Sequence, residues 1–269
     1  MPIFIDQMKR AVAIPAAPKR IVSLVPSQTE LLNDLGLTNE VVGITKFCIH
    51  PKDWLMNKTR VGGTKNVNFE TIEKLQPDLI IANKEENSQE DILLLEKKYP
   101  VWISNIIDLN DALLMIKEVG VITNRIEAAM HLSEKIRIQF EALEKLMEGK
   151  QKRRVAYFIW NKPMMVAGCE NFINNLLARC CFENVFEHTQ YFHEQKQSYR
   201  YPEIKVNELS DANPDLILLS SEPFPFGEKH IAQFKAICPA ADVKIVDGEM
   251  FSWYGSRMLQ AVNYFKTLL

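Results

Sequence analysis

The chain has 269 residues, of which 47% are apolar and 25% are charged, and its 32 basic and 34 acidic side chains give a formal net charge of −2. This composition is typical of a soluble globular protein and excludes a chain that is mainly disordered. The near balance of charge argues against a protein that binds nucleic acid through an overall basic excess, so we expect no nucleic-acid partner. The length predicts two domains of ordinary size or one large domain.

The sequence contains no run approaching 18 consecutive apolar residues, and no membrane-spanning helix is therefore predicted. The start, MPIFIDQMKRAVAIP, has neither the apolar segment nor the small-residue cleavage site of a secretory signal. The five cysteines are an odd number and Cys180 and Cys181 are adjacent, which does not indicate a disulfide framework. As the sequence stands we expect a cytoplasmic protein, with a periplasmic or cell-surface location if a leader has been removed.

Strands and helices alternate along the first part of the chain, which is typical of an open α/β sheet. The apolar run Ile21–Val25 predicts a buried strand. Ser27, with Glu30 three residues later, predicts a capping box for the helix that follows. Further strands are predicted at Val41–Ile44, Leu79–Ala82 and Val101–Ile103, and helices at Phe69–Leu75 and Asp91–Lys98.

A long helix is predicted between Thr123 and Gly149, because this stretch has no proline or internal glycine and its apolar residues recur on one face. It would span about 36 Å for about 24 residues. The α/β pattern then starts again. Strands are predicted at Val155–Trp160, Leu216–Leu219 and Val243–Val246, and helices at Asn171–Cys180, Glu208–Ala212, His230–Ile237 and Ser256–Leu268.

An internal repeat indicates two related halves. VNFETIEKLQPDLIIANKEE, from Val67, and IKVNELSDANPDLILLSSEP, from Ile204, share a helix, Pro-Asp-Leu-Ile, a strand and a Glu after the strand, Glu85 or Glu222. The sequence therefore predicts an α/β protein of two Rossmann-like lobes with open sheets: an N-terminal lobe (1–122), a linking helix (123–150) and a C-terminal lobe (151–269).

Ligands of open α/β sheets bind outside the carboxyl ends of the strands, so we expect a ligand in a cleft between the lobes. The loops predicted to form this site follow Val25, Ile44, Ala82, Trp160, Ser221 and Val246.

Several segments, in the same order along the chain, resemble the substrate-binding proteins of metal-chelate ABC importers. They are RIVSLVPSQTELL, VGGTKNVNFETIEKLQPDLIIA, the long helix, YPEIKVNELSDANPDLILL and DGEMFSWYGSR, which together cover the chain from about Arg20 to Leu268. The resemblance is strongest to the vitamin B12-binding proteins, and the siderophore- and haem-binding relatives share the fold. It implies a helical-backbone (class III) binding protein, a monomer that holds a metal chelate between its lobes, performs no chemistry and has no intrinsic cofactor.

The resemblance also implies roles for individual residues. In the B12-binding relatives, aromatic side chains from both lobes stack on the corrin ring. One such position aligns with Thr64 here, so that aromatic is lost. Tyr201 matches the aromatic of the second lobe, and the segment near the end matches through Asp247, Phe251, Trp253 and Tyr254, with Arg257 near an Arg of the family.

A second set of implied residues concerns an ABC permease. Exported relatives carry one surface Glu per lobe that docks on the permease. Glu70 fills this position in the first lobe, whereas Asn207, next to Glu208, stands in the second. The missing Glu leaves open a cytosolic relative that has left the transporter.

Polar side chains at strand exits are predicted to contact the rim of the ligand: Lys65, Asn66, Lys84, Glu86, Arg200 and Arg257. The alternative for the loop clusters is that they form Asx turns. Phe224 and Phe226, stiffened by neighbouring prolines, are predicted ligand contacts, with packing in the core as the alternative.

Cys48 and His50 raise the possibility of a metal ligand, His50 as an axial ligand to a chelated metal, against a packed Cys and a surface His. Glu187, His188, His193 and Glu194 form a looser cluster that we interpret as a solvated loop.

The sequence thus favours a binding protein for a corrinoid such as cobalamin, followed by haem and ferric siderophores. An enzyme that uses Cys48, His50 and Glu222 in the same cleft, and an interaction protein that has lost its ligand, are the alternatives of other classes.

Overall fold

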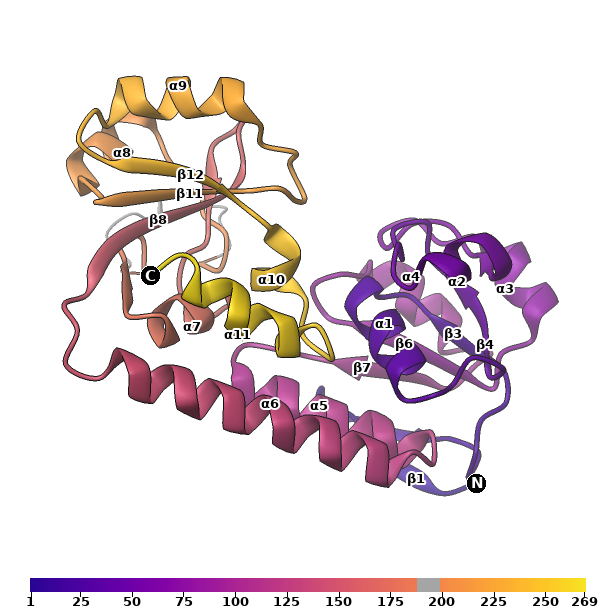
Figure 1. Cartoon of the computed structure of the whole chain (residues 1–269). Helices are drawn as coiled ribbons and strands as arrows, with labels where there is room; N and C mark the ends of the chain where they lie inside the picture. The colour runs from indigo at the N-terminus through magenta and orange to yellow at the C-terminus, as the bar shows by residue number, and fades with distance from the viewer. Residues whose placement is uncertain (188–198) are drawn as a thin grey trace. The chain divides into compact units, whose positions relative to one another are not determined.

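The computed structural model describes residues 1–187 and 199–269 (Figure 1). The chain forms two compact units. Unit 1 consists of residues 1–106, 110–137 and 254–259, and unit 2 of residues 107–109, 138–253 and 260–269. Each unit is built on its own sheet, as the repeat in the sequence predicts.

Unit 1 contains a parallel five-stranded sheet in the order β5-β4-β3-β6-β7. The central strands β3 and β6 are buried at every residue, as expected for a parallel sheet covered on both faces. A short antiparallel hairpin, β1–β2, precedes the sheet. The elements are β1 Ile3–Ile5, β2 Ala11–Ala13, β3 Ile21–Ser23, α1 Pro26–Asp34, β4 Val41–Ile44, α2 Lys52–Asn57, β5 Thr59–Arg60, α3 Phe69–Leu75, β6 Leu79–Asn83, α4 Gln89–Leu95, β7 Val101–Ser104 and α5 Leu109–Ile122.

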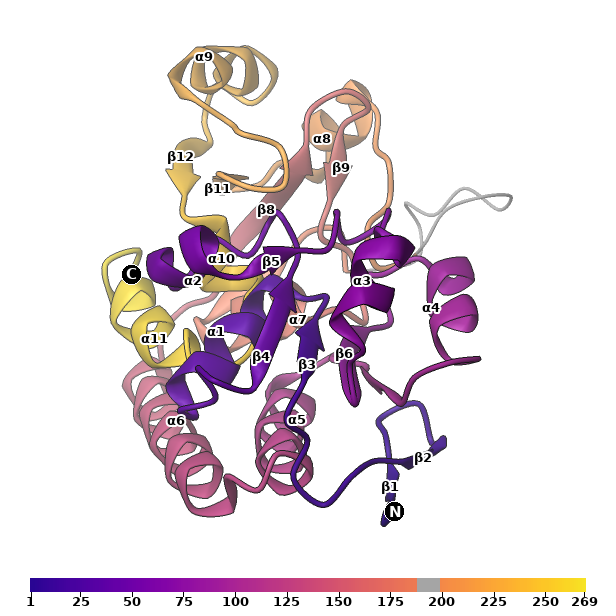
Figure 2. The same ribbon diagram turned by 90° about the vertical axis from the view of Figure 1, so that its right-hand side faces the viewer.

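Unit 2 contains a second sheet, in which β10-β8-β11-β12 run parallel and β9 pairs antiparallel with β8. Its core includes Phe158, Leu219 and Phe234, all fully buried. The elements are β8 Arg153–Trp160, β9 Met165–Val166, α7 Phe172–Arg179, β10 Phe182–Asn184, α8 Val206–Ala212, β11 Leu216–Ser220, α9 Glu228–Ile237, β12 Asp242–Val246, α10 Gly248–Ser252 and α11 Met258–Lys266 (Figure 2).

The long helix is α6, Ile126–Met147, which has 22 residues and confirms the predicted helix. The boundary between the units falls inside it, after Arg137, and the chain returns briefly to unit 1 at Tyr254–Leu259. The predicted boundaries at residues 122 and 150 instead treat the helix as a separate segment. Among the described residues, no helix combines the length and the apolar character needed to cross a membrane.

The α/β class is confirmed, but some local expectations are corrected. Helix α1 begins at Pro26, and Val25, its N-cap, offers no side-chain hydrogen bond, so the predicted capping box is wrong. Proline suits the first helical position because its fixed φ is already helical. The sequence pattern also did not predict β1, β2, β5, β9, β10, α2, α5 and α10.

Candidate functional site

The carboxyl edge of the unit 1 sheet is held together by one amide side chain. The strand order reverses between β3 and β6, and Asn87 lies at this point. Its Oδ1 accepts a hydrogen bond from Asn83 N at 2.8 Å, and its Nδ2 donates to Leu24 O at 3.2 Å and Thr64 O at 3.0 Å. Asn87 therefore connects the loop after β3, the loop after β6 and the turn at Thr64.

The polar cluster after β6 is largely engaged in its own turn. Asn83 Oδ1 accepts hydrogen bonds from the backbone N–H groups of Glu85 and Glu86, at 2.8 and 3.1 Å, which is the Asx-turn arrangement of the alternative interpretation. Lys84 is exposed and Glu86 is half-buried. A ligand contact by either side chain stays a prediction.

The turn that carries Lys65 and Asn66 lies beside this loop. The Nζ atom of Lys65 donates to the carbonyls of Glu85 and Asn87, so the ammonium is tied to the loop after β6. Asn66 is exposed, and its carbonyl accepts from Gly63 N at 2.8 Å. The turn needs glycine at Gly62, where φ is +100° and a Cβ would lie 2.6 Å from the Asn66 carbonyl oxygen.

Phe47 is an aromatic of the unit 1 edge that the sequence analysis did not predict. Its side chain follows β4 and is 51% exposed. Its ring edge lies 3.3 Å from the position of a Cβ on Gly63, next to Thr64, and Lys46 Nζ lies 5.0 Å from the ring centroid. Phe47 therefore offers a ring beside the position where the aromatic expected from the resemblance is lost.

The neighbouring Cys48 is a packed cysteine and not a reactive one. Its side chain is fully buried, and its Sγ lies 3.1 Å from the hydroxyls of both Thr29 and Thr45. Burial raises the pKa of the thiol, so it is not an activated nucleophile. This burial contradicts the enzyme alternative that used Cys48.

A metal site built from protein side chains alone is not found in the described ranges, 1–187 and 199–269, where no group of three or more His, Cys, Asp or Glu is arranged to hold an ion. His50 is half-buried, and its role as an axial ligand stays a prediction. His188, His193 and Glu194 lie outside the described residues.

Arg257 occupies a largely buried position in unit 1. Its Nε and one terminal nitrogen donate to the two carboxylate oxygens of Glu30, at 2.8 and 2.6 Å. The two side chains are only 8% and 12% exposed. Burial raises the pKa of Glu30, and the hydrogen bonds and charge of Arg257 oppose that shift. The guanidinium thus satisfies a largely buried carboxylate of the same unit, and a ligand contact by Arg257 stays a prediction.

At the carboxyl edge of unit 2, Trp160 and Phe224 form an aromatic pair. Trp160 ends β8, is 37% exposed and lies with its ring centroid 5.5 Å from that of Phe224, which is half-buried. Phe226 is only 6% exposed and packs edge-on against Phe234, so the core-packing alternative describes it. The sequence placed the loop after Trp160 in the site but did not single out the side chain.

The segment after β12 folds into the short helix α10. Asp247 is its N-cap and accepts from Glu249 N at 3.0 Å. Trp253 and Tyr254 follow the helix and are each 6% exposed. The Trp253 indole Nε1 donates to Glu222 Oε1 at 2.8 Å. Stacking of a ligand on Trp253 or Tyr254 stays a prediction.

Arg200 and Tyr201 lie in a half-buried turn of unit 2. The Arg200 carbonyl accepts from Gly168 N at 2.8 Å and from Asn171 Nδ2 at 2.7 Å, which fixes the backbone there. Nothing in these contacts tests the predicted ligand roles of the two side chains.

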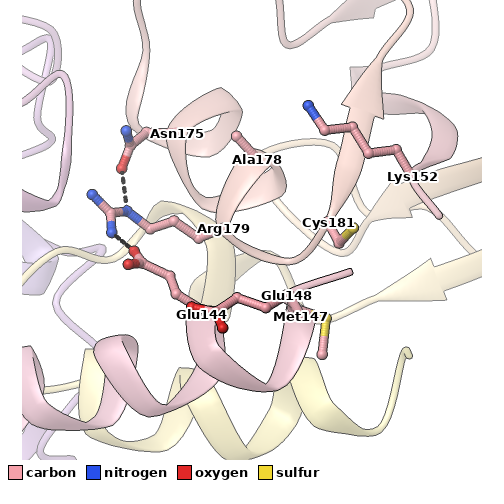
Figure 3. A pocket seen from close by; sticks show the side chains of 8 residues that line it. All are labelled: Glu144, Met147, Glu148, Lys152, Asn175, Ala178, Arg179 and Cys181. Atoms are coloured by element: carbon pink, nitrogen blue, oxygen red, sulfur yellow. Dashed lines mark hydrogen bonds and ion pairs between the residues drawn. The ribbon is translucent and has the colours of Figure 1, made fainter. Parts of the chain in front are cut away.

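A pocket of about 510 Å³ lies elsewhere in unit 2 (Figure 3). Its lining comes from the end of α6, from α7 and from residues just before β8 and β10, which places it at the amino ends of these parallel strands. Arg179 crosses it and binds Glu144 and Asn175. The full lining is Glu144, Met147, Glu148, Lys152, Asn175, Ala178, Arg179 and Cys181. This pocket is not the predicted ligand site, because the predicted loops follow the carboxyl ends.

Comparison with known proteins agrees with the fold. Residues 21–236 match the family described as periplasmic binding protein. The vitamin B12-binding protein of Vibrio campbellii is 24% identical over 203 residues, which are 75% of this chain and 70% of the relative.

Two solved structures illustrate the likeness in fold. The periplasmic vitamin B12 binding protein BtuF of Vibrio cholerae superimposes with a TM-score of 0.78 at 21% identity, covering 94% of this chain and 98% of that one. The periplasmic haem-binding protein RhuT of Roseiflexus sp. RS-1 also reaches 0.78, at 19% identity, covering 91% and 95%. The fold is therefore common to proteins named for different chelates.

Proposed function

The chain belongs to the periplasmic binding protein family, and on that premise we propose that it binds one corrinoid molecule, with cobalamin as the favoured ligand, and releases it unchanged. The family is one of binding proteins, so binding without catalysis is the function of its members. The choice of a corrinoid rests on the relatives named as vitamin B12-binding proteins, which share 24% identity over most of the chain.

The observation that carries the proposal is the presence of partly exposed aromatic rings at the carboxyl edges of both sheets. Phe47 follows β4 in unit 1, and Trp160 with Phe224 follows β8 and β11 in unit 2. The Trp160 and Phe47 rings are 37% and 51% exposed, and rigid rings of this kind lose little entropy when they are ordered against a flat ligand. Each stacked ring contributes about 0.5–1.5 kcal/mol beyond the area that it buries.

Polar groups would complete the contact with the ligand rim. Asn66 is exposed on the turn beside Phe47 and Lys84 is exposed on the loop after β6, and we propose that they hydrogen-bond amide groups of the corrin side chains. Tyr201 and Arg200 remain proposed contacts in unit 2. His50 remains the proposed donor to the chelated metal.

The proposal is tested by titrating the protein with cyanocobalamin, followed by visible absorbance and calorimetry. We expect saturable one-to-one binding with a dissociation constant below about 10 µM, a free energy near −7 kcal/mol. Phe47→Ala and Trp160→Ala should each weaken binding, whereas Leu146→Ala, an apolar residue 48% exposed on α6, should not. Absence of binding at about 100 µM, weaker than about −5.5 kcal/mol, would contradict the corrinoid proposal.

Haem is the second candidate, because the haem-binding protein RhuT matches the fold with the same TM-score as BtuF. The two chelates differ at the rim, where haem carries carboxylates and cobalamin carries amides. A parallel titration with haemin separates them: saturable binding of haemin and none of cyanocobalamin would replace the first proposal by the second.

An ABC permease is the proposed protein partner, with Glu70 as a docking residue. Glu70 is the second residue of α3 and is exposed. In unit 2, Asn207 occupies the second position of α8, and the adjacent Glu208 carboxylate accepts from Lys205 N at 2.6 Å. The Glu208 carboxylate is thus hydrogen-bonded at the start of its own helix. We therefore do not propose it as the docking residue in place of the missing Glu.

A further inference from the structure

Glu222 is a half-buried carboxylate at the carboxyl edge of unit 2 that binds two donors through one oxygen. The Trp253 indole Nε1 donates to Glu222 Oε1 at 2.8 Å, and Ser252 Oγ donates to the same atom at 2.7 Å. Both donors are neutral. Burial raises the pKa of Glu222, and these two hydrogen bonds oppose the shift because they favour the carboxylate.

The backbone around Glu222 is built to bring α10 close to it. Gly248 N, at the start of α10, donates to Ser221 Oγ at 2.9 Å. A Cβ on Gly248 would lie 2.4 Å from Ser220 Oγ and 2.6 Å from Glu222 Cγ, so any larger residue would push the helix away. Ser220 Oγ also donates to the Glu222 carbonyl at 2.5 Å. These contacts hold the loop that carries Glu222 in place independently of its bond to Trp253.

The contact determines how the indole is oriented. Trp253 has one polar side-chain atom, an N–H that only donates, and the residue is 6% exposed. Glu222 holds this N–H on one side while the backbone N–H of Trp253 bonds to Glu249 O at 3.0 Å. The ring is thus anchored at both its backbone and its far edge, which leaves little freedom of rotation.

We propose that Glu222 is a positioning residue: it holds the indole of Trp253, a predicted stacking residue, in the orientation required for ligand binding, an inference that rests on the proposed function. Glu222 itself does not touch the ligand. The corresponding residue of the first repeat is Glu85, whose backbone carbonyl accepts from Lys65.

The test is a double-mutant cycle between Glu222 and Trp253, read by cyanocobalamin affinity and by tryptophan fluorescence of the ligand-free protein. Glu222→Ala removes the acceptor and should weaken binding about tenfold, whereas Glu222→Gln keeps an amide oxygen as acceptor and should stay within about threefold of the parent. Trp253→Phe keeps a ring without the N–H. Because the two residues act through one contact, the double variant should bind about as well as Trp253→Phe alone.

Fluorescence tests the positioning without a ligand. The Trp253 signal is the difference between each protein and its Trp253→Phe counterpart, since the chain has 4 tryptophans. This signal should become more accessible to acrylamide in Glu222→Ala but not in Glu222→Gln or Ser252→Ala, which removes only the second donor. Circular dichroism confirms that each variant is folded.

Three results would overturn the inference: additive losses in the double variant, unchanged affinity in Glu222→Ala, or equal losses in Glu222→Gln and Glu222→Ala. Failure of the proposed function has a different signature, in which the parent protein binds neither cyanocobalamin nor haemin. In that case unchanged quenching in Glu222→Ala refutes the positioning, and increased quenching that Glu222→Gln reverses supports it.

Discussion

Compared residue by residue, the helix–strand repeats α3–β6 of unit 1 and α8–β11 of unit 2 begin in the same way and end differently. In unit 1, Asp78 accepts from Arg20 N at 2.8 Å and returns a bond from its own N–H to Arg20 O at 3.0 Å. The Arg20 Nε donates to Leu75 O, at the end of α3, at 2.7 Å. Asp78 thus fixes the start of β6 beside the start of β3. Arg20 bonds to a carbonyl at the end of α3 that has no partner within the helix.

Unit 2 contains the same kind of contacts, made by Asp215 and Arg154. Asp215 accepts from Arg154 N at 3.0 Å, and its N–H donates to Arg154 O at 2.9 Å. A terminal nitrogen of Arg154 donates to Ala212 O, at the end of α8, at 2.7 Å. The amino edges of both sheets are therefore built on the same Asp–Arg arrangement.

The carboxyl edges differ. In unit 1, Asn83 and Asn87 close the loop after β6 with side-chain amides. In unit 2, Ser220 stands at the position of Asn83, and Glu222 turns its carboxylate toward Trp253. The two units thus share the edge that registers the strands and differ at the edge that presents the loops, as expected where ligands bind at the carboxyl ends.

The largest expected effect concerns the buried carboxylates of the two units. Glu30 of unit 1 is balanced by a guanidinium, whereas Glu222 of unit 2 is balanced by neutral donors. Arg257→Ala should lower the free energy of unfolding by about 3 kcal/mol, because it leaves Glu30 buried without its cation. Urea denaturation measures this.

The control is Arg137→Ala, which breaks an ion pair with Glu134 whose side chains are 43% and 54% exposed. This loss should be far smaller than that for Arg257→Ala, because solvent screens an exposed pair. Equal losses for Arg257→Ala and Arg137→Ala would show that the Glu30 pair is not a buried one.

The two Asp residues differ in the number of backbone donors that they bind. The Asp78 carboxylate accepts from both Lys19 N and Arg20 N, whereas the Asp215 carboxylate accepts from Arg154 N alone among the described residues. Asp78→Ala should therefore lower the free energy of unfolding by about 2 kcal/mol and Asp215→Ala by about 1 kcal/mol. Asp78→Asn keeps one acceptor oxygen and should lose about half as much as Asp78→Ala. Urea denaturation of these variants checks this, and equal losses for Asp78→Ala and Asp215→Ala would contradict it.

The sequence was sufficient for the elements whose causes are local. Helix α3 was predicted with its observed ends, because Asn68 caps it, with Oδ1 accepting from Thr71 N at 2.9 Å, and Pro77 follows it. The α/β alternation and the long helix followed from apolar periodicity. The predicted capping box at Ser27 is wrong because the helix begins one residue earlier, with Pro26 at its first position, so that Ser27 lies inside the helix.

The candidate site was harder to predict, since its contacts join residues far apart in the chain. Arg257 binds Glu30, more than two hundred residues earlier, and no periodicity reveals this partner. Phe47 and Trp160 are exposed, but an aromatic after a strand looks in sequence like a core residue. Only the fold separates the exposed rings from Phe226, which the structure buries.

A third carboxylate, Glu118 of α5, extends the comparison because its Oε2 is buried without a hydrogen-bond partner in the described residues. Burial, followed by the nearby Asp6, raises the pKa of Glu118 to about 7, partly offset by Lys9. The folded state then keeps a proton that the unfolded chain has lost, so the free energy of unfolding falls as the pH rises from about 4.5 to about 7.

Glu118→Gln should remove this fall, which we expect to be about 1 kcal/mol after allowing for the partial exposure of the side chain. Urea denaturation of both proteins at pH 4.5 and pH 7.5 measures it, with the exposed Glu127→Gln on α6 as the control. The same pH dependence in Glu118→Gln and the parent would refute the assignment.

The smallest effect distinguishes the two helix ends that precede the repeated Pro-Asp. Gln76 after α3 and Asn213 after α8 both adopt left-handed backbone, with φ of +44° and +42°. Asn tolerates this conformation better than Gln, because its short side chain can hydrogen-bond locally. Gln76→Gly should therefore stabilise the protein by about 0.5 kcal/mol, whereas Asn213→Gly should change stability by only about 0.2 kcal/mol, since the freedom that glycine adds to the unfolded chain offsets the smaller relief. Thermal unfolding measures both, and Gln76→Ala, which keeps a Cβ, should give no gain. A gain for Asn213→Gly as large as that for Gln76→Gly would mean that the two helix ends carry the same strain and that the repeats differ only at their carboxyl edges.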